Sequence, residues 1–480
     1  MEQESKHNLK KNSVISLLSL FFQSGYSAVL GLVANLVLTI VLAPATFGIY
    51  TLVLSINSLL NYFSDIGLAA SLVQKKDVTE DDLKTTFTVQ QGLIIPLVTV
   101  GFLATSFITS YFNLPPEAIY LYWAVLASFF FSSLKTIPSI KLERGIQFQK
   151  IVLVQIVENT LFYISVSLLA LAGFGLHSFT ISVLIRSVVG TVLIYSFSFW
   201  MPHIGISKES LKKLLSFGVP FQTNTLLALV KDDLILLFLG KVLGLEALGY
   251  IGWAKRWAEA PIRIIMDNIN RILFPIFSRL QHEKEKVQQL LDKVIQYQTL
   301  ILAPIYIGLF LLMHKIFILI PKYDKWEPAL PLFYMFVIAA FFSSYSNPFT
   351  NLFNALGKIK WTFYFMIYWT VASWILIPIV TLQVGIYGFP IAQIALSLTF
   401  VPIMILARSL VPFQPLGIIV KPLVASVVMG IIVYALAQLE TTWLNVIVTV
   451  FSGGLSYIFI LYVVFQMNIM KDIRNIIRYE

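Results

Sequence analysis

The sequence predicts an all-α membrane protein with about 14 transmembrane helices, and three observations lead to that fold class. Hydrophobic residues make up 58% of the 480 residues and charged residues 12%, with a mean hydropathy of +0.83. A soluble domain is about half apolar and a quarter charged. The apolar residues form runs of membrane-spanning length, and Lys and Arg gather in alternate breaks between the runs. Cysteine is absent, which excludes disulfides and thiolate chemistry.

Each apolar run is long enough to cross a bilayer, because about 20 residues span a hydrocarbon core of about 30 Å. In chain order we predict spans at 13–41, 47–73, 86–111, 117–139, 151–173, 177–200, 214–240, 247–277, 294–320, 328–356, 361–384, 386–411, 416–437 and 442–467. The apolar stretch of the first, from Val14 to Val41, is too long for the core of a cleaved signal peptide. We expect it to stay as a helix.

Basic residues are divided unequally between the two sides of these spans. The side that holds the N-terminus carries 23 Lys and Arg in its loops and tails, and the other side carries four. Cytoplasmic loops hold the excess of Lys and Arg, so we predict that both termini are cytoplasmic. The same rule accounts for the net charge of +10, and we expect no nucleic-acid partner.

Signals of catalysis are lacking. The outer loops are short, the longest running over about 321–327, and there is no Gly-Lys-Ser/Thr phosphate loop or metal-ligand spacing among the five His. We therefore expect neither an enzyme nor a cofactor. In the loop 77–84, Thr79 is followed three residues later by Asp82, a spacing typical of a capping box, so a helix is expected to begin there.

An internal repeat predicts the domain organisation. Residues 41–48 (VLAPATFG) match 242–249 (VLGLEALG) at an offset of 201. An offset of 202 maps the polar positions Asn57, Asn61 and Asp65 onto Glu259, Arg263 and Asp267. One inserted residue reconciles the two offsets. We predict two six-helix lobes, 1–200 and 201–411, related by pseudo-symmetry around a central cavity, and a segment 412–480 with two further helices and a cytoplasmic tail. The alternative is chance similarity between apolar helices.

A stripe of charge crosses the eighth predicted span. Its members recur every four residues with alternating sign, which places them on one helix face over about 24 Å. They are Lys255, Glu259, Arg263, Asp267 and Arg271, with Arg256 beside the first. If these six groups faced lipid at about 2.5 kcal/mol each, the cost would approach about 15 kcal/mol. They are expected to line water or to pair within the bundle.

Other predicted spans also carry charged groups, and together with the stripe they supply the candidate site. The candidate substrate-binding cations are Lys231, Lys255, Arg256, Arg263, Arg186 and Arg271. The candidate carboxylates, which would hold those cations or bind a coupling ion, are Asp65, Glu158, Asp232, Asp233, Glu259 and Asp267. Lys135 is expected to snorkel to the membrane surface. Two alternatives stay open: ion pairs that only lock the bundle, and an amphipathic interfacial helix over 255–271.

Four strings resemble one family. They are FGIYTLVLSINSLLNYFSDIGLAASLVQKKDVTEDDL (47–83), LLSFGVPF (214–221), LGLEALGYIGWAKRW (243–257) and RILFPIFSRLQ (271–281). They are similar to the Wzx-like polysaccharide flippases of the multidrug/oligosaccharidyl-lipid/polysaccharide exporter superfamily, over most of the chain to about residue 411. The resemblance implies two six-helix lobes plus a terminal pair, a V-shaped central cavity, and residence in the bacterial plasma (inner) membrane.

The resemblance also implies an activity: flipping of undecaprenyl-pyrophosphate-linked glycans from the cytoplasmic to the outer leaflet. It implies that cavity cations bind the pyrophosphate, and the matching residues are Lys231, Lys255, Arg256 and Arg263. An Asp common in the family's seventh helix matches Asp232 or Asp233.

The leading hypothesis is therefore an alternating-access flippase for a polyprenyl-pyrophosphate-linked oligosaccharide, driven by the membrane potential or by an ion, with H⁺ and Na⁺ both open. Besides the bilayer, the polysaccharide polymerase or ligase machinery is an expected partner. The alternative is a cation-coupled multidrug exporter of the same superfamily, which would favour acidic and aromatic cavity walls. A membrane glycosyltransferase or polymer ligase would need a catalytic loop domain, and a scaffold would not maintain so many intramembrane charges.

Overall fold

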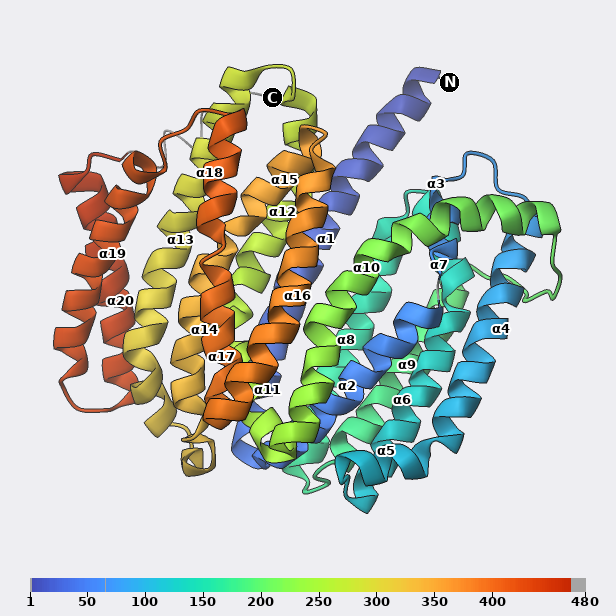
Figure 1. Cartoon of the computed structure of the whole chain (residues 1–480), viewed down its shortest axis with the longest axis horizontal. Coiled ribbons are helices and arrows are strands. Elements are labelled where there is room, and N and C mark those ends of the chain that lie inside the picture. Colours follow the sequence, from blue (N-terminus) through green and yellow to red (C-terminus); the bar gives the residue numbers. More distant parts are fainter. Residues whose placement is uncertain (1, 65, 468–480) are drawn as a thin grey trace. The chain divides into compact units, whose positions relative to one another are not determined.

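The computed structural model describes residues 2–64 and 66–467, and within those ranges every regular element is a helix (Figure 1). The chain forms two compact units. The first unit is Met1–Trp253 with Met366–Leu376, and the second is Ala254–Phe365 with Ile377–Glu480. Two long helical segments, α11 and α16, contribute residues to both units.

The first unit is built from ten complete helices of the described chain and parts of two more. They are α1 (Glu2–Val41), α2 (Pro44–Ser64), α3 (Leu68–Gln74), α4 (Glu80–Leu103), α5 (Thr105–Phe112), α6 (Pro116–Leu134), α7 (Thr136–Arg144), α8 (Phe148–Leu171), α9 (His177–Phe197), α10 (Lys208–Leu243), the start of α11 (Leu245–Pro261) and the middle of α16 (Ile359–Val384). Within it, α8 packs against α1 and α9, α9 against α6, and α10 against α2 and α3.

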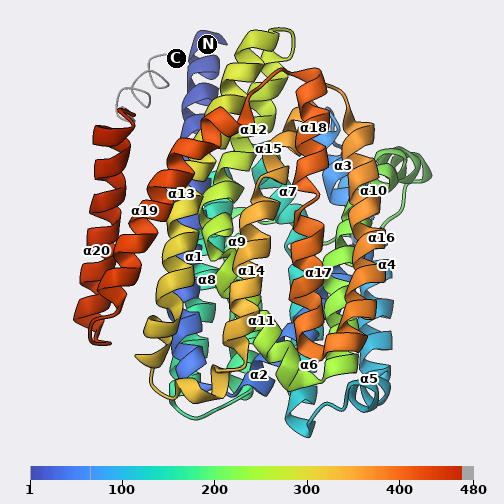
Figure 2. The ribbon, with the colours of Figure 1, turned by 60° about the vertical axis from the view of Figure 1, so that its left-hand side comes forward.

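The second unit holds the rest of α11 and α16 and the remaining described elements. They are η1 (Ile262–Met266), α12 (Asp267–Leu280), α13 (Lys284–Ile318), η2 (Tyr323–Trp326), α14 (Ala329–Ser344), α15 (Ser346–Ala355), η3 (Gly385–Tyr387), α17 (Gly388–Ser397), α18 (Phe400–Leu410), α19 (Pro415–Ala437), α20 (Trp443–Phe459) and η4 (Ile460–Val464). In this unit α13, α19 and α20 lie side by side around a shared apolar core (Figure 2).

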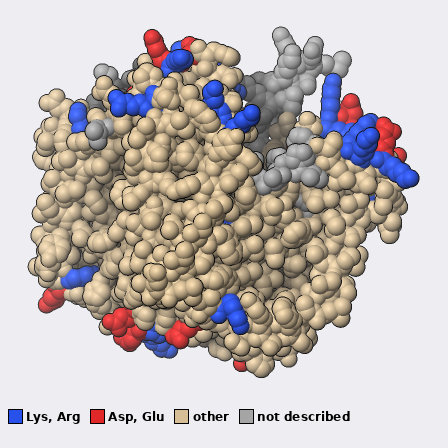
Figure 3. All heavy atoms as spheres, viewed as in Figure 1, with Lys and Arg blue, Asp and Glu red and all other residues tan. Residues whose placement is uncertain are grey.

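The helices have the length and apolarity that a bilayer requires. Ten helical segments among the described residues are suited to cross a membrane, and an eleventh is added if the bent pair α2 and α3 forms one span. The charged side chains on the face shown in Figure 3 gather near helix ends, and the surface between them is almost uncharged. The chain is thus an all-helical, multi-pass membrane protein, as the composition predicts.

The count of ten or eleven differs from the fourteen predicted spans at identifiable places. The predicted spans 361–384 and 386–411 lie in one continuous candidate, Ile359–Leu410. The predicted spans 214–240 and 247–277 correspond to α10 and to α11 with α12, which are not among the candidates. The predicted helix 86–111 is divided at Ala104 into α4 and α5.

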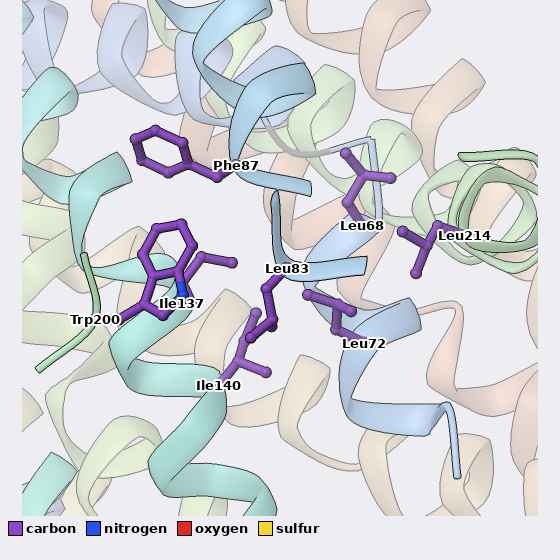
Figure 4. Packing of buried hydrophobic residues seen from close by; sticks show 8 residues of the cluster. All are labelled: Leu68, Leu72, Leu83, Phe87, Ile137, Ile140, Trp200 and Leu214. Atoms are coloured by element: carbon purple, nitrogen blue, oxygen red, sulfur yellow. The ribbon is translucent and has the colours of Figure 1, made fainter. Parts of the chain in front are cut away.

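A junction of short helices orders one end of the first unit. The capping box expected at Thr79 is confirmed: the Thr79 side chain accepts from the Asp82 backbone N–H, and the Asp82 carboxylate accepts from the Thr79 N–H at 2.9 Å. Figure 4 shows an apolar cluster that begins with the residue after Asp82, in which Leu83 of α4 points toward Leu72 of α3 and Ile140 of α7. This packing holds α3, α4 and α7 together.

Candidate functional site

The charge stripe in the second unit forms a linked set of ion pairs. Glu259 accepts from Arg263 at 2.9 Å, and its other carboxylate oxygen lies 3.7 Å from the Lys255 ammonium. The ammonium also lies 5.5 Å from the centre of the Phe389 ring on α17. Lys255 is 22% exposed and Arg263 59% exposed, so one carboxylate holds a sheltered cation and an open one. The four-residue spacing thus places these three groups on one helix face.

The predicted span 247–277 corresponds to a continuous helical run from Leu245 to Leu280, but the run is not α-helical throughout. Helix α11 ends at Pro261, and the next five residues form the π-helical turn η1, which includes Arg263. Proline has no N–H to continue the α-helical bonding, and a π turn bonds each residue to the fifth along the chain. The turn lies after Glu259, where the repeat offset is already 202, so it is not the residue inserted between the two halves of the repeat. The side chains of Asp267 and Arg271 lie outside the described residues.

The candidate charges on α10 belong to the first unit. Lys231 donates to its neighbour Asp232 at 2.6 Å, and the two side chains are 25% and 47% exposed. The Trp374 indole N–H of α16 donates to the Val230 carbonyl at 2.8 Å, which fixes the helix backbone beside this pair. Asp233 lies on the same turn of α10 and is half-buried. Arg256, on α11 in the second unit, is also half-buried. Asp65 lies outside the described residues.

The remaining candidates of the first unit have partners that the sequence did not indicate. Glu158 of α8 is 5% exposed and accepts from Lys135 at 2.6 Å, where the sequence suggested that Lys135 would snorkel. A Cβ atom at Gly190 of α9 would lie 1.5 Å from the Glu158 carboxylate, so only glycine leaves room for this pair. Arg186 is exposed and lies over the Phe162 ring. In the sequence, Gly190, three to four turns into an apolar helix, was the only signal that could have indicated the close packing of Glu158 against α9.

These arrangements differ in what they can bind. The Lys135–Glu158 pair is buried and mutually neutralised, which suits a structural contact. The Arg263 guanidinium is held at one edge by Glu259 and is otherwise open, and a guanidinium can bind a phosphate with two parallel hydrogen bonds. The Lys255–Glu259–Arg263 set is therefore the described group best able to accept an anionic ligand.

Comparison with known proteins places the chain in a family. The family model described as "Polysaccharide biosynthesis protein" matches residues 37–331. The lipopolysaccharide biosynthesis protein WzxC of Escherichia coli (strain K12) is 25% identical over 71% of this chain and 69% of its own length. The teichuronic acid biosynthesis protein TuaB of Bacillus subtilis (strain 168) is 24% identical over 62% of each chain. The succinoglycan biosynthesis transport protein ExoT of Rhizobium meliloti (strain 1021) is 22% identical over 58% of this chain and 56% of its own.

Solved structures share the fold. The lipid II flippase MurJ in an inward closed conformation has a TM-score of 0.78 at 16% identity, covering 94% of this chain and 99% of MurJ. An inward-facing MATE multidrug resistance transporter has a TM-score of 0.62 at 15% identity, covering 82% and 98%. The relatives named by activity are transporters or flippases, which confirms the expectation of a transport protein and not an enzyme. The chain belongs to the family of polysaccharide biosynthesis proteins that includes the Wzx-like flippases, and it has the fold of the multidrug/oligosaccharidyl-lipid/polysaccharide exporter superfamily.

Proposed function

We propose that this protein flips undecaprenyl-pyrophosphate-linked oligosaccharides from the cytoplasmic to the outer leaflet of the bacterial inner membrane, for the synthesis of a cell-surface polysaccharide. The family and its relatives support this class of cargo, since WzxC, TuaB and ExoT are named for three different polysaccharides. The shared chemistry of the cargo is then its lipid pyrophosphate, and the glycan is the variable part.

The observation that carries the proposal is the open guanidinium of Arg263, joined through Glu259 to Lys255. An arriving pyrophosphate competes with Glu259 for these two cations, because it presents more negative charge and more acceptor oxygens than one carboxylate. The cation on α10, Lys231, is held by Asp232 in the same way. In this mechanism Arg186, Arg256 and Arg271 supply further positive potential, and the carboxylates hold the cations in place or bind a coupling ion.

The proposed architecture has fourteen spans with both termini in the cytoplasm. It is reached from the candidate spans by joining α2 with α3, dividing Ile359–Leu410 into two, and adding α10 and the α11–α12 run. The proposed lobes are 1–200 and 201–411, and 412–480 follows them. Alternating access of a central cavity between the lobes would move the headgroup across the membrane. Export of a polyanion is favoured by an inside-negative potential, by about 2.3 kcal/mol per charge per 100 mV.

The test replaces the proposed pyrophosphate ligands. Arg263→Ala and Lys255→Ala are expected to abolish surface polysaccharide in cells that depend on this protein, with unchanged amounts of protein in the membrane. Arg263→Lys should retain part of the activity, because a lysine keeps the charge but not the two-pronged geometry. Lys213→Ala is the matched control, since Lys213 forms the same four-residue pair with Glu209 on an exposed turn.

Binding is measured separately from export. Inorganic pyrophosphate should raise the thermal unfolding temperature of the purified protein and of Lys213→Ala, and should have no effect on Arg263→Ala. Normal export by both Arg263→Ala and Lys255→Ala would refute the proposed role of these cations. If cells carrying these variants lost resistance to cationic drugs and kept normal surface polysaccharide, the result would instead indicate the multidrug exporter.

A further inference from the structure

Helices α2 and α11 meet at their first turns through bare backbone. A Cβ atom added to Gly48 of α2 would lie 1.7 Å from the Leu245 carbonyl oxygen, and one added to Gly249 of α11 would lie 1.9 Å from the Pro44 carbonyl oxygen. Both distances are far shorter than any real Cβ contact, so each position can hold only glycine while the helices touch. We call this contact the glycine seam, formed by Pro44, Gly48, Thr51, Leu245, Gly249 and Gly252, all within the first unit.

The seam follows the sequence repeat residue by residue. At the offset of 201, Pro44 corresponds to Leu245 and Gly48 to Gly249. The contact of Gly48 with Leu245 is therefore the mirror of the contact of Gly249 with Pro44. Contacts that are exchanged in this way are the mark of a two-fold relation between two surfaces.

Further contacts of α2 and α11, including their contacts with α10 and α1, obey the same offset. Thr51 corresponds to Gly252, and the two face each other, with 2.9 Å between the Thr51 hydroxyl and a Cβ built at Gly252. The Trp253 indole donates to the Thr39 hydroxyl at 2.9 Å.

At the same offset Trp253 corresponds to Leu52 and Thr39 to Gly240, and Leu52 and Gly240 also meet. A Cβ at Gly240 would lie 2.5 Å from a Leu52 methyl carbon. The single offset of 201 therefore accounts for two sets of mirrored contacts, Gly48–Leu245 with Gly249–Pro44 and Trp253–Thr39 with Leu52–Gly240. It also accounts for the contact of Thr51 with its own counterpart, Gly252. This agreement makes chance similarity a poor explanation of the repeat.

We propose that the glycine seam is the closure of the transport path on the side with few basic residues, and that Gly48 and Gly249 are the residues that allow it to close. The proposal rests on the transport function given above. Small residues let two helix backbones approach closely in a membrane. At Gly48 and Gly249 backbone lies directly on backbone, so at these two positions the helices can meet and separate without moving a side chain.

The first experiment locks the seam. The Thr51 Cβ lies 3.8 Å from a Cβ built at Gly252, within the range of about 3.5–4.5 Å found in disulfides, and the chain has no native cysteine. In the full-length protein, oxidation of the pair Thr51→Cys and Gly252→Cys should form a disulfide and stop polysaccharide export, and reduction should restore it. The control pair, Ser165→Cys and Ser182→Cys, joins hydroxyl positions 2.8 Å apart on α8 and α9 and should leave export unchanged when oxidised.

The second experiment adds a methyl group at the glycine seam, to hold the two helices apart. A membrane-impermeant maleimide added outside should label a single Thr51→Cys reporter slowly, and Gly48→Ala or Gly249→Ala should raise that labelling several-fold. The two glycines should act alike because they are repeat counterparts. Gly92→Ala on α4 is the matched control, since nothing lies within 4 Å of a Cβ there.

The outcomes separate this inference from the proposed function. Failure of the 51–252 disulfide to form, or unchanged labelling in both glycine variants, would overturn the seam. A disulfide that forms but leaves export intact would show a permanent contact and overturn its role as a closure. Labelling needs no cargo, so a response of the reporter in a protein that exports no polysaccharide would support the seam and refute the flippase.

Discussion

The first unit contains two helix contacts of contrasting chemistry, the α3–α4–α7 junction and the glycine seam. At the junction, the fully buried Asp82 carboxylate accepts from Lys75 at 2.6 Å and from the Thr79 N–H. Arg144 of α7 donates to the Leu72 carbonyl at 2.7 Å and the Lys76 carbonyl at 2.8 Å, and so binds the end of α3. At the seam, Gly48 and Gly249 only place backbone against backbone.

The difference indicates which contact is permanent. Hydrogen bonds to charged groups are directional and strong, and breaking them in a buried place leaves charges without partners. Contacts between glycine backbones carry no such penalty when they part. The junction is thus suited to hold α3 in every state of the protein, and the seam is suited to open.

The largest effect is expected from Asp82→Ala. It removes the capping box and leaves Lys75 without its buried partner, which should lower the free energy of unfolding by about 3 kcal/mol. Thermal or denaturant unfolding in detergent measures the loss. Asp81→Ala, which removes only an exposed pair with Lys84 at 3.8 Å, should change stability by less than about 0.5 kcal/mol. Equal effects of the two variants would remove the distinction between the junction and ordinary surface pairs.

Arg144→Ala should be next, with a loss of about 2 kcal/mol, because several carbonyls at the end of α3 lose a charged donor. Arg144→Lys should recover only part of the loss, since one ammonium cannot reach the same carbonyls as the guanidinium fork. The same unfolding measurement applies, together with protease sensitivity near residue 75. Full recovery by lysine would mean that charge alone, and not the fork, holds α3.

A smaller effect is expected beside the glycine seam from Trp253→Phe, on α11 next to Gly252. This change removes the hydrogen bond to Thr39, which keeps its bond to the Asn35 carbonyl at 2.6 Å, and leaves a small cavity at a buried ring, so it should cost about 1.5 kcal/mol. It should still raise labelling of the Thr51→Cys reporter, because α11 loses a directional bond to α1 next to the glycine seam. A loss of stability as large as that of Asp82→Ala would contradict the view that the seam separates easily.

The smallest effect, and one of opposite sign, is expected from Gly92→Ala. The residue is exposed on α4 with open space around it, so alanine should stabilise the helix by about 0.5 kcal/mol. Comparison with Gly249→Ala under identical conditions isolates the close approach at the seam from helix propensity. Destabilisation at Gly92 would show that the difference between the two glycines has another cause.

Several features of the site could be predicted from local sequence. The spacing of Thr79 and Asp82 gave the capping box, and the four-residue spacing placed Lys255, Glu259 and Arg263 on one face. The match of Gly48 with Gly249 was visible as a repeat, but its meaning as a close contact was not. The π turn after Pro261 and the break at Ala104 were also missed, because apolar length alone does not mark where an α-helix changes its bonding.

The amino-acid sequence by itself determined that this chain is helical and spans a membrane, because apolar length, charge distribution and capping depend on residues close together in the chain. Only the tertiary structure decided which distant groups meet. It pairs Glu158 with Lys135 and packs it against Gly190, leaves Arg263 open beside Glu259, and places Gly48 against the Leu245 carbonyl. Such contacts depend on how whole helices pack, and helix packing brings together residues that no short stretch of sequence relates to one another.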